Sequence, residues 1–267
     1  MGDWDAVFDE TYLQTYAPFA DEVRTRPEAL GAASLAELEP GAEVLDCPTG
    51  FGRHALVLAE AGYRVTGFDR SPELLADAKR RRGGAEWPHL VRGDYRELPF
   101  SDASFDAVFN LFSSLGYLEQ DEDVGVLREF RRVLRPGGVL VVETAHRDGF
   151  AHFAQPFARR TWERLPDGSL HLEERVPDWA AGTIDTYRVI IGPSGERVER
   201  PYMLHVYSVK EWVEMPRKAG FGDVGAFGAF GAWDGVTPIG PEAWRMILRA
   251  RWRMILRARW RMILRAR

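Results

Sequence analysis

The sequence predicts an α/β fold, a doubly wound and mainly parallel sheet that carries a small antiparallel β lid. From Gly41 to about Glu143, short apolar or β-branched runs alternate with helical patterns. This order is typical of parallel strands joined by crossover helices. From Phe150 to Arg200 strand-like runs instead surround Pro-Asp-Gly and Pro-Ser-Gly turns, which favours antiparallel hairpins.

Each predicted strand of the parallel part is followed by a turn or a helix signal. The helix from Gly52 has its apolar residues close together, and Ser71-Pro72 caps the next helix. A third helix over 121–134 stops at Arg135-Pro136-Gly137-Gly138, which is expected to turn the chain into the next strand. The five predicted strands are Glu43–Asp46, Tyr63–Phe68, His89–Arg92, Phe105–Leu111 and Val139–Glu143.

Outside the parallel strands, the sequence predicts an N-terminal helical cover, an inserted antiparallel lid and a C-terminal part that belongs to the core. A helix is predicted over 208–219, a strand from Phe221 and a last strand over 243–251. The lid strands expected are Trp162–Leu165, Ser169–Val176, Thr183–Ile191 and Arg197–His205. The predicted divisions are a helical cover over 1–40, a core over 41–149 and 206–251, a lid over 150–205 and a tail over 252–267.

Composition limits the classes of partner. The 267 residues, 45% of them hydrophobic, suffice for one large α/β domain with a modest insertion. The net charge is −5, but the last 24 residues hold nine arginines and no acid, so the body has 26 basic and 40 acidic residues. An acidic body repels a phosphate backbone. We therefore expect a small-molecule substrate and no nucleic-acid partner.

The lengths of the apolar runs and the pattern of cysteine and histidine predict no membrane partner and no metal site. No apolar run approaches the roughly 18 residues that span a bilayer, and no leader pattern opens the chain, so a cytoplasmic location is predicted. Cys47 is the one cysteine, which excludes an internal disulfide and a cysteine zinc cluster. The six histidines form no H-x-x-x-H pair, so no metal is expected.

A glycine-containing turn follows the first predicted strand. In Asp46-Cys47-Pro48-Thr49-Gly50-Phe51-Gly52 it lies before a helix N-terminus, where a ligand can approach bare backbone N–H groups. Asp69 ends the second strand region, and a carboxylate there can accept the hydrogen bonds of a ribose diol. Together they indicate a cofactor that contains adenosine.

Two cofactor classes fit this turn, and the motifs that follow favour one of them. The segment 50–55 matches the relaxed dinucleotide pattern G-x-G-x-x-A, so a nicotinamide-dependent oxidoreductase is an alternative. Further along come Gly93-Asp94, Ser104-Phe105-Asp106-Ala107-Val108 and Leu134-Arg135-Pro136-Gly137-Gly138, in that order. With this series the sequence resembles class I S-adenosylmethionine-dependent methyltransferases over nearly all of 3–251. A module that binds S-adenosylmethionine without catalysis is a second alternative.

The resemblance implies a Rossmann-like methyltransferase fold and methyl transfer to a nitrogen or oxygen of a small molecule by direct displacement. It places Gly50 against the methionine part of S-adenosylmethionine, Asp69 at the ribose hydroxyls and Asp94 at the adenine amine. Pro48 stands where the family usually has its first glycine, and it removes one N–H there. The other cofactor-binding residues implied in the core are Asp46, Gly52, Arg70, Tyr95 and Asn110.

Three further side chains are candidates for the site. Tyr12 and Tyr16 share a helix face and either pack in the core or, as the resemblance implies, close over the sulfonium. His146 follows the fifth strand, at the edge where open α/β sheets bind ligands, and is the candidate general base. Its alternative role is a bond to a backbone group of the lid. The segment 111–118 is similar to a loop of methyltransferases that modify amines.

The tail repeats Trp-Arg-Met-Ile-Leu-Arg-Ala-Arg at 244–251, 252–259 and 260–267. An even period keeps tryptophan, methionine, leucine and alanine on one strand face. We expect the first copy to be the last strand and the other two to be a duplication. Ending the chain after Arg251 should then leave cofactor affinity intact.

Overall fold

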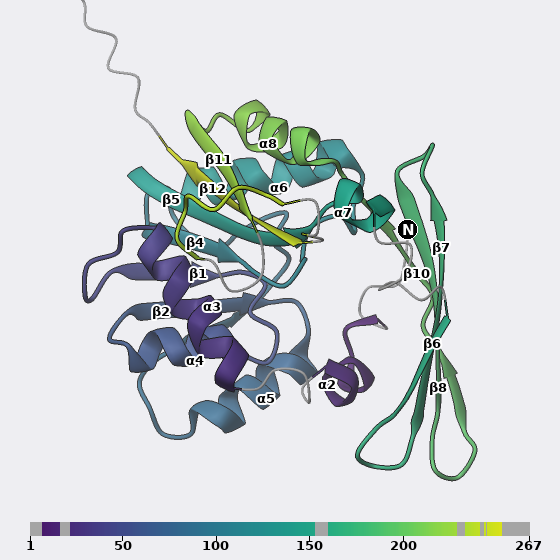
Figure 1. Ribbon diagram of the computed structural model, residues 1–267. Coiled ribbons are helices and arrows are strands. Elements are labelled where there is room, and N and C mark those ends of the chain that lie inside the picture. The colour runs from purple at the N-terminus through teal and green to yellow at the C-terminus, as the bar shows by residue number, and fades with distance from the viewer. Residues whose placement is uncertain are drawn as a thin grey trace, which may run out of the picture.

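The computed structural model describes residues 7–16, 22–152, 160–228, 233–240, 243 and 245–252. Its chain forms a seven-stranded sheet in the order β11-β12-β5-β4-β1-β2-β3 and a separate antiparallel sheet (Figure 1). Strands β1 to β5 are parallel, whereas β12 runs antiparallel to β5 and β11 antiparallel to β12. The predicted fold class is therefore confirmed.

The elements follow the predicted order closely. The strands of the large sheet are β1 Glu43–Asp46, β2 Arg64–Asp69, β3 His89–Arg92, β4 Phe105–Asn110, β5 Leu134–Ala145, β11 Asp223–Gly228 and β12 Arg245–Arg251. The helices are α2 Glu10–Tyr16, α3 Glu22–Leu35, α4 Arg53–Glu60, α5 Pro72–Arg82, α6 Gln120–Val133, α7 Arg147–His152 and α8 Val209–Lys218.

Both faces of the parallel sheet are buried, and this explains why its strands lack polar alternation. Side chains point to opposite faces at successive positions of a strand. Val44 and Phe109 pack in a cluster with α3 and α4, whereas Leu45 and Val108 pack in a cluster with α6 and α8. Parallel sheets covered by helices on both sides need such continuous apolar runs. The carboxyl ends of the strands are left at one edge, where the site forms.

Strand β5 begins at Leu134, earlier than the predicted Val139. The register against β4 pairs Phe105 with Leu134 and then Ala107 with Val139, so the Pro-Gly-Gly segment forms an irregularity inside the pairing. The prediction that this segment is a turn ahead of the strand is therefore wrong. A Cβ on Gly138 would lie 2.9 Å from the carbonyl oxygen of Arg135, so the crowded backbone there requires glycine.

The antiparallel sheet lies beside the core, and α2 stands between the two (Figure 1). Its strands are β6 Arg160–Arg164, β7 Leu170–Asp178, β8 Thr183–Ile191, β9 Arg197–Glu199 and β10 Tyr202–His205. The strand predicted over 197–205 is two strands, both paired with β8, because Pro201 between them has no N–H for the ladder.

Residues 245–251 of the first copy of the tail repeat form β12, and the next residue, Trp252, continues the contacts of this strand; Trp244 lies outside the described residues. The Trp252 backbone exchanges hydrogen bonds of 3.0 Å with Gly137 and Gly138, and the Arg131 guanidinium lies 4.9 Å from the indole centroid. The rest of the second copy and the third copy lie outside the described residues. Among the helices that the structure describes, none combines the length and the apolar character needed to cross a membrane.

We expect a chain ended after Trp252 to unfold at the same temperature as the full chain. A chain ended after Arg251 should unfold at a lower temperature, because it loses two backbone hydrogen bonds of about 1 kcal/mol each. Thermal unfolding followed by circular dichroism compares the three chains. A large loss of folding in the chain that ends after Trp252 would contradict the prediction that the second and third copies, 252–259 and 260–267, are a duplication.

Candidate active site

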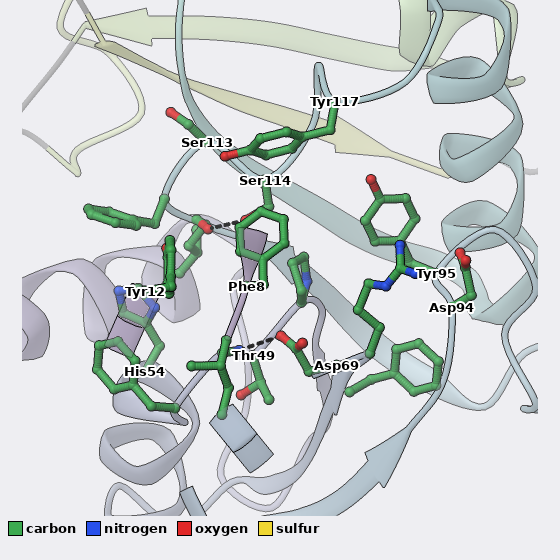
Figure 2. A pocket seen from close by; sticks show the side chains of 18 of the residues that line it. Phe8, Tyr12, Thr49, His54, Asp69, Asp94, Tyr95, Ser113, Ser114 and Tyr117 are labelled. Carbon is green, nitrogen blue, oxygen red and sulfur yellow. Dashed lines mark hydrogen bonds between the residues drawn. The ribbon is translucent and has the colours of Figure 1, made fainter. Parts of the chain in front are cut away.

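A cavity that opens to solvent lies at the carboxyl ends of β1, β2, β3 and β4, and the empty space there, open solvent included, is about 1100 Å³ (Figure 2). Seven of the eleven predicted site residues line it, namely Tyr12, Tyr16, Gly50, Asp69, Arg70, Asp94 and Tyr95. Residues that the prediction did not include also line it, among them Phe8, Arg53, His54, Arg96, Phe112, Ser113 and Tyr117.

The turn after β1 presents its backbone to the cavity. Gly50 has a φ of 56° and Gly52 a φ of 77°, which is a conformation that favours glycine. A Cβ on Gly52 would come within 2.9 Å of the Ala78 Cβ on α5, whereas a Cβ on Gly50 would meet nothing within 4 Å. Gly52 therefore allows α4 and α5 to pack closely, and Gly50 leaves open space on the cavity side.

Asp69 connects this turn to the end of β2. Its Oδ2 accepts the Gly50 N–H at 2.7 Å, and its Oδ1 accepts the Ser71 N–H at 2.9 Å. Burial raises the pKa of Asp69, although these hydrogen bonds favour the charged form and oppose the rise. Each carboxylate oxygen has two lone pairs, so Asp69 can accept further hydrogen bonds from the cavity.

Asp46 and Asn110 do not line the cavity and instead support the turn from behind. The Thr49 hydroxyl donates to Asp46 Oδ2 at 2.7 Å, and the Asn110 amide donates to the Cys47 carbonyl at 2.9 Å. Both side chains are buried. Asn110 Oδ1 has no hydrogen-bond partner among the described residues. Both side chains therefore act on the cavity through the β1 turn.

The buried Asp46 makes a testable contribution to pH-dependent stability. Burial raises the pKa of Asp46 to about 7, so the folded chain holds a proton that the unfolded chain releases near pH 4. The free energy of unfolding should therefore fall as the pH rises from about 4 to about 7. Asp46→Asn should make this fall shallower. It should not abolish it, because burial also raises the pKa of Asp123 to about 7. Urea unfolding at pH 5 and pH 8 compares the two chains, and equal falls would exclude Asp46 as a source.

At the far side of the cavity Asp94 and Tyr95 follow β3. Two nitrogens of Arg96 contact the Asp94 carboxylate at 2.6 to 3.1 Å. Burial acts to raise the pKa of Asp94, but the hydrogen bonds from Arg96 outweigh it and lower this pKa. Asp94 therefore stays ionised beside the cavity. Its partner Arg96 could have been suspected from the sequence only because it lies two positions after Asp94 of the Gly93-Asp94 motif.

The loop after β4 has a strained backbone. Phe112 and Ser113 have φ of 69° and 57°, a conformation that residues other than glycine rarely adopt. Glu143 of β5 holds both, since its carboxylate accepts the Phe112 N–H and its carbonyl accepts the Ser113 N–H, each at 2.9 Å. Such strain concentrates at functional sites. No sequence pattern indicates this strain, because the segment has no glycine at these positions.

A charged cluster stands where α4 begins. Glu28 of α3 accepts from Arg53 at 2.6 Å and lies 3.0 Å from the His54 ring nitrogen. Burial lowers the pKa of His54 to about 4, so its ring is neutral and donates to Glu28. Arg53 Nη2 is buried and has no partner among the described residues. An unpaired guanidinium nitrogen beside a cavity suits an anionic group of a ligand.

His146 does not line the cavity. It is buried, its Nδ1 accepts the Gly149 N–H at 3.1 Å, and burial lowers its pKa. The lone pair that a general base needs is already engaged by this backbone group of α7. The geometry therefore favours a structural role for His146, although the backbone group it bonds belongs to Gly149, which lies outside the lid predicted over 150–205.

Helix α2 covers the cavity with aromatic rings. The Tyr12 and Tyr16 centroids are 4.5 Å apart, and Phe8 lies 5.1 Å from Tyr12 and 5.2 Å from Tyr117. Burial raises the pKa of Tyr12 to about 12, so its hydroxyl stays protonated. Phe8 lies four positions before Tyr12, in the bend that precedes α2, so the spacing that identified Tyr12 and Tyr16 could also have identified Phe8.

Comparison with known proteins identifies the family. A family model described as a methyltransferase domain matches residues 44–138. A demethylmenaquinone methyltransferase of Beutenbergia cavernae is 35% identical over 167 residues, which are 58% of this chain and 64% of that protein. The CcbJ methyltransferase of Streptomyces caelestis is 25% identical and superposes with a TM-score of 0.71 over 86% of this chain and 90% of that one. Residues 44–138 of the chain therefore form a methyltransferase domain.

A further solved structure shares the fold and contains the cofactor of the family. It is S-adenosylmethionine-bound CalS10, an amino pentose methyltransferase of Micromonospora echinaspora. Its identity to this methyltransferase is 18%, with a TM-score of 0.66 over 91% of this chain and 96% of that one. The match of residues 44–138 to a methyltransferase domain sets the nicotinamide alternative aside. The open side of Gly50, the unused lone pairs of Asp69 and the unpaired Arg53 nitrogen all fit S-adenosylmethionine.

Proposed function

We propose that this chain transfers the methyl group of S-adenosylmethionine to a nitrogen or oxygen atom of a small molecule by direct displacement. The observation that carries the proposal is a single cavity with a polar side and an aromatic side. Asp69, Asp94 and Tyr95 lie on one side, and Phe8, Tyr12 and Tyr117 lie toward the other (Figure 2). A cofactor with polar ends and a reactive centre between them suits this arrangement.

Four residues are proposed to hold the cofactor. Asp69 would accept the ribose hydroxyls, and Asp94 the adenine amine. The Gly50 backbone would lie against the methionine part. The buried Arg53 nitrogen would pair with its carboxylate, because a guanidinium binds a carboxylate strongly in a dry site. Asp46, Gly52 and Asn110 are proposed to act indirectly, through the shape of the β1 turn.

When bound, S-adenosylmethionine supplies an electrophilic methyl group on a sulfonium that leaves as a neutral thioether. The chain then has to orient the acceptor and exclude water, since holding two reactants in line supplies most of the rate. The strained loop at Phe112 and Ser113 and the rings of α2 surround the acceptor side. Their fixed positions are proposed to provide that alignment.

A small-molecule acceptor is favoured by the acidic body of the chain and by the size of the cavity. The relatives named above act on unlike small molecules, a demethylmenaquinone in one case and an amino pentose in another. This diversity leaves the acceptor of the present chain to experiment.

Two measurements test the proposal. Isothermal calorimetry should detect binding of S-adenosylmethionine, and mass spectrometry of small molecules retained on purification should yield a candidate acceptor for a turnover assay. A module without catalysis would bind the cofactor yet methylate nothing in a broad metabolite screen. Affinity for NAD without affinity for S-adenosylmethionine would overturn the assignment.

A further inference from the structure

A buried arginine of the antiparallel sheet reaches the edge of the cavity. Arg188 of β8 is 3% exposed, and its Nη2 donates to the hydroxyl oxygens of Tyr16 at 2.8 Å and Tyr202 at 3.1 Å. Its Nε donates to Glu173 at 3.0 Å. The guanidinium carbon lies 5.3 Å from the Tyr16 centroid and 4.9 Å from that of Tyr202. Arg188 thus connects β8 to α2.

These bonds determine what the two hydroxyls can do. Each oxygen accepts from Arg188, so its own hydrogen points elsewhere, and no acceptor for either hydrogen is found among the described residues. Burial raises the pKa of Tyr16 despite the nearby Arg188, so this hydroxyl keeps its hydrogen at neutral pH. Tyr16 lines the cavity. The Tyr16 hydroxyl, polarised by Arg188, is therefore a donor without an acceptor on a residue that lines the cavity.

The charges around this donor favour an oxygen ligand. Within the described part of the chain, the carboxylates that line the cavity are Asp69 and Asp94, and Asp94 lies across the cavity from Tyr12 of α2 (Figure 2). Glu173 contacts Nε and the same Nη2 of Arg188 and balances part of its charge, but it is shared with Arg175, so two guanidinium groups face one carboxylate. A cationic amine beside Tyr16 would meet a guanidinium and a donor hydrogen, whereas an oxyanion would be stabilised by both.

We propose that the Tyr16 hydroxyl, polarised by Arg188, binds an ionised oxygen of the methyl acceptor, and that the acceptor is an acidic hydroxyl compound of the phenol or enol class. The inference rests on the function proposed above. The acceptor's proton passes to solvent water, and the oxygen keeps the electron pair that attacks. Tyr16 contacts the acceptor, and Arg188 is a positioning residue that acts through Tyr16.

The test uses 4-nitrophenol, whose anion absorbs visible light, with protein saturated with S-adenosylhomocysteine. Absorbance is measured across a pH series with protein in excess. We expect bound nitrophenol to ionise about one pH unit or more below free nitrophenol, as expected for a group near a fixed cation. Tyr16→Phe should remove most of this shift, because it deletes the donor and keeps the ring.

Tyr12→Phe is the matched comparison, since Tyr12 shares the helix and the cavity but has no hydrogen bond from Arg188, and the shift should persist there. Arg188→Lys keeps the positive charge beside Glu173 but loses the planar guanidinium that donates to several oxygens at once, so it should reduce the shift in the nitrophenol pKa. A bound nitrophenol that ionises at its free pKa or above it, or no nitrophenol binding by protein that binds S-adenosylhomocysteine, would overturn the inference alone. Protein that binds neither S-adenosylhomocysteine nor S-adenosylmethionine would instead overturn the proposed function.

Discussion

Replacing Asp69 with alanine should weaken the binding of S-adenosylmethionine by about 1.5 to 3 kcal/mol, the range for hydrogen bonds to a charged group. The structure adds a second cause, because Asp69 Oδ2 also holds the Gly50 N–H at 2.7 Å. Without the carboxylate, the turn against which the methionine part is proposed to lie loses a fixed contact. Isothermal calorimetry at neutral pH measures the change in dissociation constant.

Two further variants separate these causes. Asp69→Asn keeps an acceptor oxygen but loses the charge, so its affinity should fall between those of the native chain and Asp69→Ala. Asp77→Ala removes a mostly buried carboxylate of α5 that pairs with Arg80 and Arg81 and does not line the cavity. Its affinity should remain native. Unchanged affinity in Asp69→Ala would remove Asp69 from the cofactor site.

The local pattern of the chain was sufficient to predict the parallel sheet. Strands β1 and β3 have the predicted bounds, and β2 is displaced by one residue, because short apolar runs between glycine and proline signals leave few alternatives. The start of β5 was wrong because the Pro-Gly-Gly segment was interpreted as a turn, whereas its backbone still pairs with β4. Hydrophobic periodicity indicates which face of a sheet a residue occupies, but it does not show at which residue the hydrogen bonds between two strands begin.

Contacts between distant segments could not be predicted from one sequence. Tyr16 and Arg188 are 172 positions apart, and Glu143 and Arg245 are 102 apart, so nothing local indicates either pair. Asp69 and Gly50, 19 positions apart, were expected to lie close because consecutive parallel strands bring their carboxyl ends together. The proposed cofactor side thus follows from topology, whereas the proposed acceptor side depends on the packing of the antiparallel sheet.

Replacing Arg245 with methionine should lower the free energy of unfolding by about 3 to 5 kcal/mol, the cost of leaving one charge of a buried pair uncompensated. Both nitrogens Nε and Nη2 of Arg245 contact the Glu143 carboxylate, and both side chains are buried between β12 and β5. Glu143 also holds the Phe112 N–H, so the strained loop beside the cavity should loosen as well. Urea unfolding followed by circular dichroism measures the loss.

The double variant Glu143→Gln/Arg245→Met should regain part of that stability, because the glutamine removes the stranded charge and still offers an oxygen to Phe112. Arg249→Met is the matched control on the same strand, since Arg249 contacts the Phe227 ring at 5.6 Å and has no ion pair with an acid in the described chain. Its loss should stay near 1 kcal/mol or below, the value of an exposed cation–π contact at roughly 0.5 to 1 kcal/mol. Equal losses of stability in Arg245→Met and Arg249→Met would show that the buried Glu143 carboxylate does not need the charge of Arg245. The rigidity of the loop at Phe112 would then need a source other than this ion pair.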